Sequence, residues 1–217
     1  MLANTYRAFL FDMDGTILTS IAAAERVWSA WAHRHGIDPA ALLPTIHGVR
    51  AEETIAKQGL VGINAHLEAQ AITAAELEDM EGVHAIAGVQ DFIGSLPPDK
   101  WAVVTSAPRE LARRRLLATG LPMPAVMITA EDVASGKPSP EGYLLAARRV
   151  GVAPSDCLVF EDAEAGILAA HAAGASVCVI TATHARKMDC PASTCIRDYV
   201  SLGVRKEQGD RFRLIGA

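Results

Sequence analysis

Short runs of apolar residues recur along the chain, and each is followed by a stretch with helical periodicity. The runs lack the polar alternation of a strand that faces water on one side, so they are typical of strands covered on both faces. They occupy residues 8–11, 101–106, 125–129, 157–162 and 176–181. Alternation of such strands with helices predicts a doubly wound α/β fold around a parallel sheet.

Proline and glycine mark the ends of the helices that follow these runs. Pro108 precedes a helical stretch that Gly120 closes, and Pro140 opens another that ends before Gly151. Proline suits the first turn of a helix, and glycine suits the position just after its last turn. The pattern therefore predicts helices between the strands, and residues 211–217 are expected to add a terminal strand.

The segment between residues 17 and 85 follows a different pattern. Apolar residues repeat at helical spacing over residues 20–36, and two later stretches are also typical of helices. Ser20 stands where the N-cap of the first helix is expected. No convincing strand interrupts these helices. We therefore predict a small helical domain at 17–85, inserted into an α/β core of residues 1–16 and 86–217.

The composition excludes several classes of protein. Half of the 217 residues are hydrophobic, which argues against a disordered chain. The formal net charge is −5 and no dense Lys/Arg tract occurs, so we expect no nucleic-acid partner. No apolar stretch approaches the length of a membrane span, so we expect no membrane partner either. We expect a monomer.

The four cysteines are expected to be reduced. No signal peptide is evident in the sequence, and a chain of this length needs no disulfide bonds to fold. Cys157 and Cys178 fall in strand-like runs, where a cysteine is usually a small buried hydrophobe. Cys190 and Cys195, with His184 nearby, match no common zinc-ligand spacing. These features predict a cytoplasmic protein.

Polar side chains follow the predicted strands at the points where those strands end. They are Asp12, Asp14, Thr105, Glu161 and Asp162. In doubly wound sheets the carboxyl ends of the strands meet at one edge, where ligands bind. Up to four carboxylates would gather there, and like charges at close range need a proton or a cation. A divalent cation with oxygen ligands, above all Mg²⁺, is the expected partner.

A phosphate group suits the other residues at this edge. Lys137 adds a compact positive charge, while Thr105 and Ser106 precede a helix whose free N–H groups could bind an anion. One carboxylate could attack phosphorus while a second exchanges protons with the leaving group and then with water. The basic residues Arg113 to Arg115, further along that helix, are expected to form a solvated face.

Four motifs follow one another along the chain. They are FDMDGT at 11–16, VVTS at 103–106, GKPSPEGY at 136–143 and VFEDAEAG at 159–166. They resemble the motifs of the haloacid dehalogenase-like hydrolase superfamily, in particular its sugar and polyol phosphatases, and span most of the chain. The resemblance implies a Rossmann-like core, a helical cap that closes over the site, and a Mg²⁺-dependent phosphatase. Its implied substrate is a small phosphoester, a sugar or polyol phosphate.

The resemblance also implies roles for three charged residues. Asp12 corresponds to the nucleophile, which forms an aspartyl-phosphate and contacts Mg²⁺. Asp14 corresponds to the general acid/base, and its backbone carbonyl to a further metal ligand. Lys137 corresponds to the residue that neutralises the nucleophile and the phosphate.

The remaining core motifs correspond to phosphate and metal binding. Thr105 matches the residue that donates to a phosphate oxygen, assisted by the backbone of Ser106 and Ala107. Glu161 and Asp162 match the acidic residues that hold the metal, directly or through water.

A loop in the helical insertion gives a hint about the substrate. Residues 47–50, HGVR, resemble the HGxR loop of glycerol-3-phosphatases and bacterial sugar phosphatases. We expect Arg50, with His47, to reach a polar substrate. The alternative is that Arg50 pairs only with Glu52, Glu53 or another acid of the insertion.

Other functions share parts of this pattern. A dehalogenase would lack Asp14, and a phosphonatase would need a Schiff-base lysine, whereas Lys57 is the only lysine of the insertion. A β-phosphoglucomutase-like mutase shares all four motifs but carries a histidine where this chain aligns Ala24. A non-catalytic module that binds phosphorylated metabolites is the alternative from a different class, and it gives no reason for the complete set of reactive groups.

Overall fold

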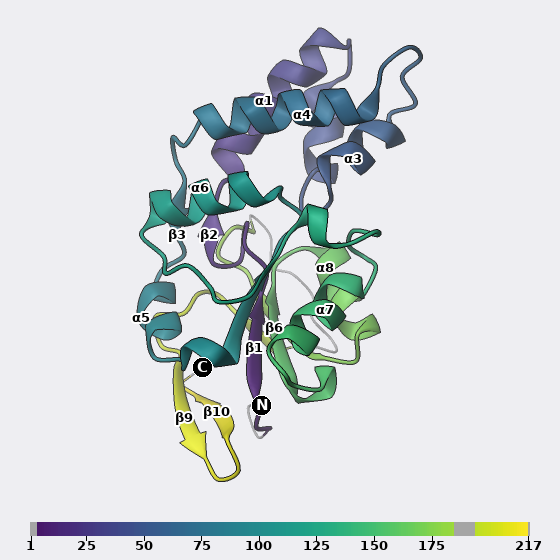
Figure 1. Cartoon of the computed structure of the whole chain (residues 1–217). Coiled ribbons are helices and arrows are strands. Elements are labelled where there is room, and N and C mark those ends of the chain that lie inside the picture. Colours follow the sequence, from purple (N-terminus) through teal and green to yellow (C-terminus); the bar gives the residue numbers. More distant parts are fainter. Residues whose placement is uncertain (1–3, 185–193, 217) are drawn as a thin grey trace.

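A computed structural model of the chain describes residues 4–184 and 194–216 (Figure 1). The strands are β1 (Ala8–Phe11), β2 (Leu18–Thr19), β3 (His84–Ala85), β4 (Trp101–Val104), β5 (Met127–Ile128), β6 (Cys157–Glu161), β7 (Ser176–Ile180), β8 (Thr194–Ile196), β9 (Gly203–Glu207) and β10 (Arg211–Ile215). The α-helices are α1 (Ile21–Arg34), α2 (Pro39–Leu42), α3 (Ala51–Lys57), α4 (Ala65–Glu78), α5 (Val89–Gly94), α6 (Arg109–Thr119), α7 (Glu141–Arg149) and α8 (Glu164–Ala172). Short 3₁₀ helices lie at Leu43–Thr45, Pro98–Lys100, Ala130–Asp132 and Pro154–Asp156.

The central sheet has six parallel strands in the order β5-β4-β1-β6-β7-β8. Its order reverses beside β1, the first strand of the chain, so the predicted doubly wound α/β class is confirmed. In register, Phe9 of β1 pairs with Trp101 of β4 on one side and with Leu158 of β6 on the other. The carboxyl ends of these three strands therefore lie side by side.

Both faces of the sheet are buried, which explains why its strands show no polar alternation. Along β1, Phe9 and Phe11 point into one hydrophobic cluster, whereas Ala8 and Leu10 point into the other. All four side chains are fully buried. Phe11 stacks on Phe160 of β6 with ring centroids 4.8 Å apart. The core thus holds β1 rigidly up to the residues that follow it.

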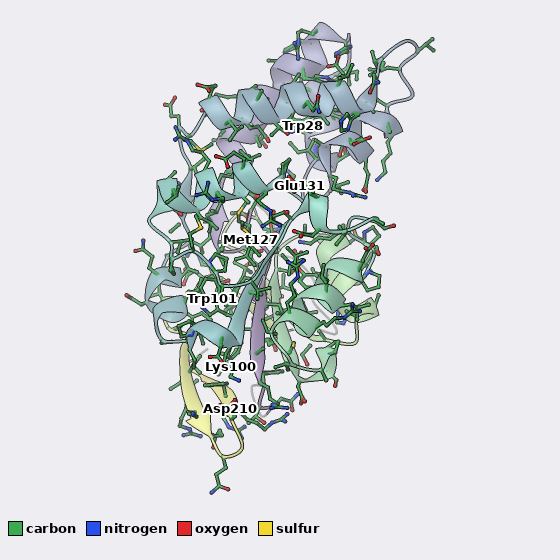
Figure 2. All side chains as sticks on the ribbon, in the orientation of Figure 1. Trp28, Lys100, Trp101, Met127, Glu131 and Asp210 are labelled. Carbon is green, nitrogen blue, oxygen red and sulfur yellow. The ribbon has the colours of Figure 1, made fainter. Side chains whose placement is uncertain are left out.

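Helices α1 to α4, here called the helical layer, have a hydrophobic cluster of their own. Trp28 and Trp31 of α1 pack edge to face at its centre, with ring centroids 5.7 Å apart. In Figure 1 this layer lies next to α6, at the edge of the sheet where the carboxyl ends of the strands lie. Trp28 is labelled within the layer in Figure 2. The chain enters and leaves the layer through β2 and β3, two short antiparallel strands that the sequence did not predict. The division at residues 17 and 85 remains a prediction.

The C-terminal strand was predicted, but its pairing was not. β10 forms an antiparallel hairpin with β9, outside the central sheet, and Phe212 exchanges backbone hydrogen bonds with Tyr6. The hairpin turn is tied to the core by an ion pair of 2.7 Å between Lys100 and Asp210 (Figure 2). This hairpin lies at the end of the molecule away from the helical layer (Figure 1).

In the described residues, 4–184 and 194–216, the helices do not combine the length and the apolar composition of a membrane-spanning segment. Cys157 and Cys178 are buried free thiols, as predicted, and burial raises the pKa of each to about 12. Cys195 of β8 is disulfide-bonded, so the expectation of reduced cysteines is wrong for this residue. Cys190 lies outside the described residues.

Candidate active site

Asp12 directly follows β1, and the sheet holds its backbone. The N–H of Asp12 donates to the carbonyl of Phe160 at 3.0 Å, and the residue is only 4% exposed. Gly15 then turns the chain with φ +91, a conformation that side-chain-bearing residues rarely adopt. A Cβ atom on Gly15 would lie 2.0 Å from Oδ2 of Asp162. This position therefore requires glycine, because the turn passes directly over the Asp162 carboxylate.

Lys137 connects the ends of three neighbouring strands. Its Nζ lies 2.5 Å from Oδ1 of Asp12, 2.7 Å from Oε1 of Glu161 and 3.3 Å from the carbonyl of Val104. Burial alone would lower the pKa of Lys137, but the carboxylates of Asp12 and Glu161 raise it above its usual value. The ammonium group therefore stays charged and holds one oxygen of Asp12.

Glu161 is completely buried, and both of its oxygens accept hydrogen bonds. Oε1 accepts from Lys137 and from the Tyr143 hydroxyl, the latter at 2.9 Å. Oε2 accepts from the backbone N–H groups of Asp162 and Ala163, at 2.9 and 3.0 Å. A Cβ atom on Gly166 would lie 1.5 Å from Oε1, so the glycine leaves the space that this carboxylate fills. Through hydrogen bonds to both of its oxygens, Glu161 thus fixes the positions of the groups around it.

Asp12, Glu161 and Asp162 form the cluster of acidic groups that the sequence predicts. One carboxylate oxygen from each lies within 4.8 Å of the others. Burial, together with Glu161, raises the pKa of Asp12 to about 7 despite the lowering effect of Lys137. Burial and the charge of Asp12 also raise the pKa of Asp162 well above its usual range. One lysine does not balance three buried carboxylates, and this oxygen-rich set suits a hard divalent cation.

Thr105, Ser106 and Ala107 follow β4, and one polar group of each already has a partner. Oγ1 of Thr105 accepts from the N–H of Ala107 at 3.0 Å, and the Ser106 hydroxyl donates to the carbonyl of Gly48 at 2.9 Å. The N–H of Arg109, in the first turn of α6, donates to the Glu131 carboxylate at 2.9 Å. In this conformation the expected anion site at the helix start is therefore partly closed by an acidic side chain.

Asp14 contacts two residues that sequence patterns assigned to other roles. Its Oδ1 accepts from the Ser20 hydroxyl at 2.6 Å and from an Arg115 guanidinium N–H at 2.9 Å. Ser20 precedes α1 but makes no capping hydrogen bond, because its hydroxyl donates to this carboxylate. Ser20 is thus the N-cap residue of α1, as predicted, but its side chain does not cap the helix.

Arg115 is not part of a solvated helix face, and that prediction is wrong as well. It is 5% exposed, and it also pairs with Glu76 of α4 at 3.3 Å. Its neighbour Arg113 is exposed, as expected. A signal for its burial exists in the sequence, because Arg115 lies four residues after Leu111 on the apolar face of α6.

Two adjoining cavities separate the helical layer from the strand ends. The smaller has a volume of about 90 Å³, and its walls include Asp12, Asp14, His47, Glu76, Thr105 and Arg115. The larger, about 850 Å³, lies between α3, α4 and residues 130–134, and Arg50 and Ser106 contribute to its walls. Desolvation lowers the pKa of His47 in the wall of the smaller cavity, which favours the neutral form of its ring.

Arg50 forms hydrogen bonds with other residues of this chain. Its Nε lies 2.7 Å from Oε1 of Glu53, and a terminal nitrogen donates to the carbonyl of Ala134 at 3.0 Å. The pairing with Glu53 is the alternative that the sequence left open, although the contact with Ala134 was not foreseen. Arg50 therefore joins the helical layer to the loop that leads to Lys137.

This fold and site define a class of enzyme in which a buried aspartate, held by a lysine, faces a cavity beside an acidic cluster. The chain belongs to the haloacid dehalogenase-like hydrolases, whose family model matches residues 6–174. The predicted family is thereby confirmed, and the phosphatases named among the relatives confirm the predicted phosphatase class of enzyme. The role of each individual residue remains a prediction.

The relatives agree with this assignment. The chain is 41% identical over 180 residues to hexitol phosphatase A of Escherichia coli, covering 81% of this chain and 83% of that one. It is 35% identical over 205 residues to validoxylamine A 7'-phosphate phosphatase of Streptomyces hygroscopicus, covering 91% and 96%. The crystal structure of CbbY from Rhodobacter sphaeroides superposes with a TM-score of 0.77 at 24% identity, covering 90% and 95%, which shows the shared fold.

Proposed function

We propose that the protein is a Mg²⁺-dependent phosphatase that hydrolyses a small sugar or polyol phosphate through an aspartyl-phosphate on Asp12. The observation that carries this proposal is the contact between Lys137 and Asp12 at the wall of a cavity that Asp14 also lines. The substrate class follows the names of the relatives, one of which is a hexitol phosphatase.

In the first step, Asp12 attacks phosphorus. Lys137 holds Oδ1 and offsets its charge, so Oδ2 is the oxygen that forms the new bond to phosphorus. The bond between phosphorus and the leaving oxygen breaks, and Asp14 gives its proton to that oxygen. Lys137 and the hydroxyl of Thr105 stabilise the charge on the phosphoryl oxygens, with the N–H groups of Ser106 and Ala107. For this, the Ala107 N–H must exchange its contact with Thr105 for one with phosphate.

In the second step, water attacks the aspartyl-phosphate. Asp14, now ionised, accepts a proton from the water, whose oxygen bonds to phosphorus as the bond to Asp12 breaks. Inorganic phosphate leaves, Asp12 is regenerated as a carboxylate and Asp14 is protonated again. Both steps require one oxygen of Asp14 to be free for proton exchange.

The residues present fit a magnesium ion. Asp12 and Asp162, with the backbone carbonyl of Asp14, would hold it directly, while Glu161 would act through water because its oxygens already accept hydrogen bonds. When bound, Mg²⁺ supplies positive charge that offsets the buried carboxylates and the phosphate.

The two cavities together set the size of the substrate. The smaller, at about 90 Å³, is well below the roughly 300 to 1,000 Å³ of ordinary ligand pockets. The larger cavity shares Ser106 and Thr73 in its wall and supplies room for the rest of a sugar or polyol. His47 in the smaller cavity and Arg50 in the larger are the residues of the insertion that we expect to contact it.

The mutase alternative has less support. A mutase needs to bind its substrate in two orientations, and Ala24, where such mutases carry histidine, adds only a methyl group to the wall of the smaller cavity. A non-catalytic module would use the same cavity for binding but would release no phosphate.

A phosphate-release screen tests the proposal. Glycerol, hexose, deoxyhexose and hexitol phosphates are incubated with wild-type protein and Mg²⁺, and with an Asp12→Asn variant as the matched control. We expect release from one group of sugar or polyol phosphates by the wild type alone. Conversion of β-glucose 1-phosphate to the 6-phosphate without release would favour the mutase, and binding without turnover would favour the module.

A further inference from the structure

We infer that Arg115 is a positioning residue for Asp14 and that Glu76 makes this positioning depend on the helical layer. The inference rests on the proposed function, because it concerns the acid/base of that reaction. Arg115 lies on α6 of the core, Asp14 follows β1, and Glu76 lies on α4 of the helical layer. Three segments far apart in the sequence thus meet at one guanidinium group.

The geometry of the guanidinium explains why an arginine suits this position. One terminal nitrogen lies 2.9 Å from Oδ1 of Asp14, and the other lies 3.3 Å from Oε1 of Glu76. The group is planar and always charged, so the direction of one contact determines the direction of the other. Its Nε is buried and has no hydrogen-bond partner within the described part of the chain. The orientation of Arg115 therefore depends on its two carboxylate partners.

The contact with Asp14 suits the chemistry of an acid/base. Arg115 and Ser20 both donate to Oδ1, so they restrain rotation of the carboxylate about its last bond. The other oxygen, Oδ2, receives no hydrogen bond from the described residues, and Asp14 is part of the wall of the smaller cavity. One oxygen is thus held while the other remains available to carry the proton.

Glu76 supplies the connection to the helical layer. It is 8% exposed and lines the smaller cavity beside Asp14 and Arg115. Burying the guanidinium of Arg115 is favourable only while carboxylates balance its charge, and one of the two comes from α4. When α4 lies against α6, as here, Arg115 is held toward Asp14. Displacement of α4 would remove Glu76 and leave Arg115 free to turn, so the acid/base is aligned only when the layer covers the site.

Leaving groups of different basicity test this role. A hexitol 6-phosphate leaves as an alkoxide that needs a proton from Asp14, whereas p-nitrophenyl phosphate leaves as a stable anion that does not. The value of kcat/KM for each substrate reports the steps up to formation of the aspartyl-phosphate. The variants are Arg115→Met and Glu76→Gln, and Arg113→Met is the matched control because Arg113 is an exposed arginine on the same helix.

We expect Arg115→Met to lower kcat/KM for the hexitol phosphate about 30-fold or more, a part of the roughly 100- to 10,000-fold that general acid–base catalysis contributes. For p-nitrophenyl phosphate the loss should stay below about 3-fold. Glu76→Gln should lower kcat/KM for the hexitol phosphate relative to that for p-nitrophenyl phosphate as well, but by a smaller factor. The double variant should lose no more kcat/KM than Arg115→Met alone. Arg113→Met should match the wild type. If Arg115→Met does not fold, Arg115→Lys keeps the buried positive charge but lacks the two terminal nitrogens of the guanidinium group. It should show the same relative loss of kcat/KM on the hexitol phosphate.

Three results would overturn the inference. Equal losses on both substrates would mean that Arg115 only supports the structure, and unchanged kinetics would mean that it does not position Asp14. Additive losses in the double variant would remove the connection through Glu76. A wild type that releases phosphate neither from p-nitrophenyl phosphate nor from any sugar or polyol phosphate of the screen would overturn the proposed function as well, which separates that failure from the other three.

Discussion

Nζ of Lys137 lies 2.5 Å from Oδ1 of Asp12, and each side chain is about 6% exposed. Replacing Lys137 with methionine keeps much of the side-chain volume but removes the charge. Because Asp12 and Glu161 would then be buried without their cation, we expect activity to be lost. The free energy of unfolding should fall by about 3 to 5 kcal/mol when measured without metal.

Lys206→Met provides a control for this variant. Lys206 is an exposed lysine on β9 whose ion pair with Asp210 spans 3.7 Å. Its loss should change the free energy of unfolding by less than about 1 kcal/mol and leave activity intact. Denaturant titration and phosphate release measure both quantities. A Lys137→Met protein as stable and active as the wild type would contradict the assigned role.

Metal binding should couple activity to stability. A divalent cation would relieve the repulsion among Asp12, Glu161 and Asp162, so Mg²⁺ should raise the melting temperature of the wild type. At 100 times its dissociation constant, the expected stabilisation is about 2.7 kcal/mol. Asp162→Asn should lose most of this response. Full activity in excess chelator, or an equal response in the variant, would argue against a metal site here.

Gly136 is expected to limit how closely the helical layer approaches the core. A Cβ atom on Gly136 would lie 2.7 Å from Nε of Arg50 and 2.9 Å from Oε1 of Glu53. Gly136→Ala should therefore displace the Arg50–Glu53 pair from the loop before Lys137. Because small misplacements at a catalytic site are costly, we expect kcat/KM to fall about 10-fold.

Arg50→Ala distinguishes docking of the layer from direct contact with substrate. If docking is the role of Arg50, then Arg50→Ala should match Gly136→Ala, and the double variant should be no worse than either. If Arg50 instead binds substrate, Arg50→Ala should mainly raise KM, by amounts that differ among substrates. Steady-state kinetics on two sugar phosphates decide between these outcomes, and a neutral Gly136→Ala would exclude docking.

The fold and the acidic end of the sheet were predictable because local patterns determine them. Continuous apolar runs predict strands buried on both faces, as in β1 and β6, and parallel topology then brings the strand ends together. The residues at those ends, Asp12, Glu161 and Asp162, did form a cluster. Lys137 joined them across 125 positions of sequence because its loop follows β5, another strand of the same parallel sheet.

What the sequence could not predict are contacts between side chains from distant segments. Arg115 was expected on the surface because its basic neighbours suggest a solvated face, and its partner Asp14 is 101 residues away. Ser20 is the N-cap residue of α1, as predicted, but its hydroxyl donates to the Asp14 carboxylate and not to the helix. Likewise, Glu131 reaches the start of α6 from 22 residues further along the chain. Periodicity describes one element at a time, so pairings of this kind become visible only in three dimensions.

Trapping the aspartyl-phosphate tests the central claim most directly. In an Asp14→Asn variant the second step lacks its base, whereas p-nitrophenyl phosphate needs no acid in the first. Acid quenching followed by peptide mass spectrometry should find one phosphoryl group on Asp12, labile to hydroxylamine, and none in the Asp12→Asn/Asp14→Asn control. A burst of p-nitrophenol without a phosphorylated peptide, or a phosphoryl group on another residue, would contradict the account.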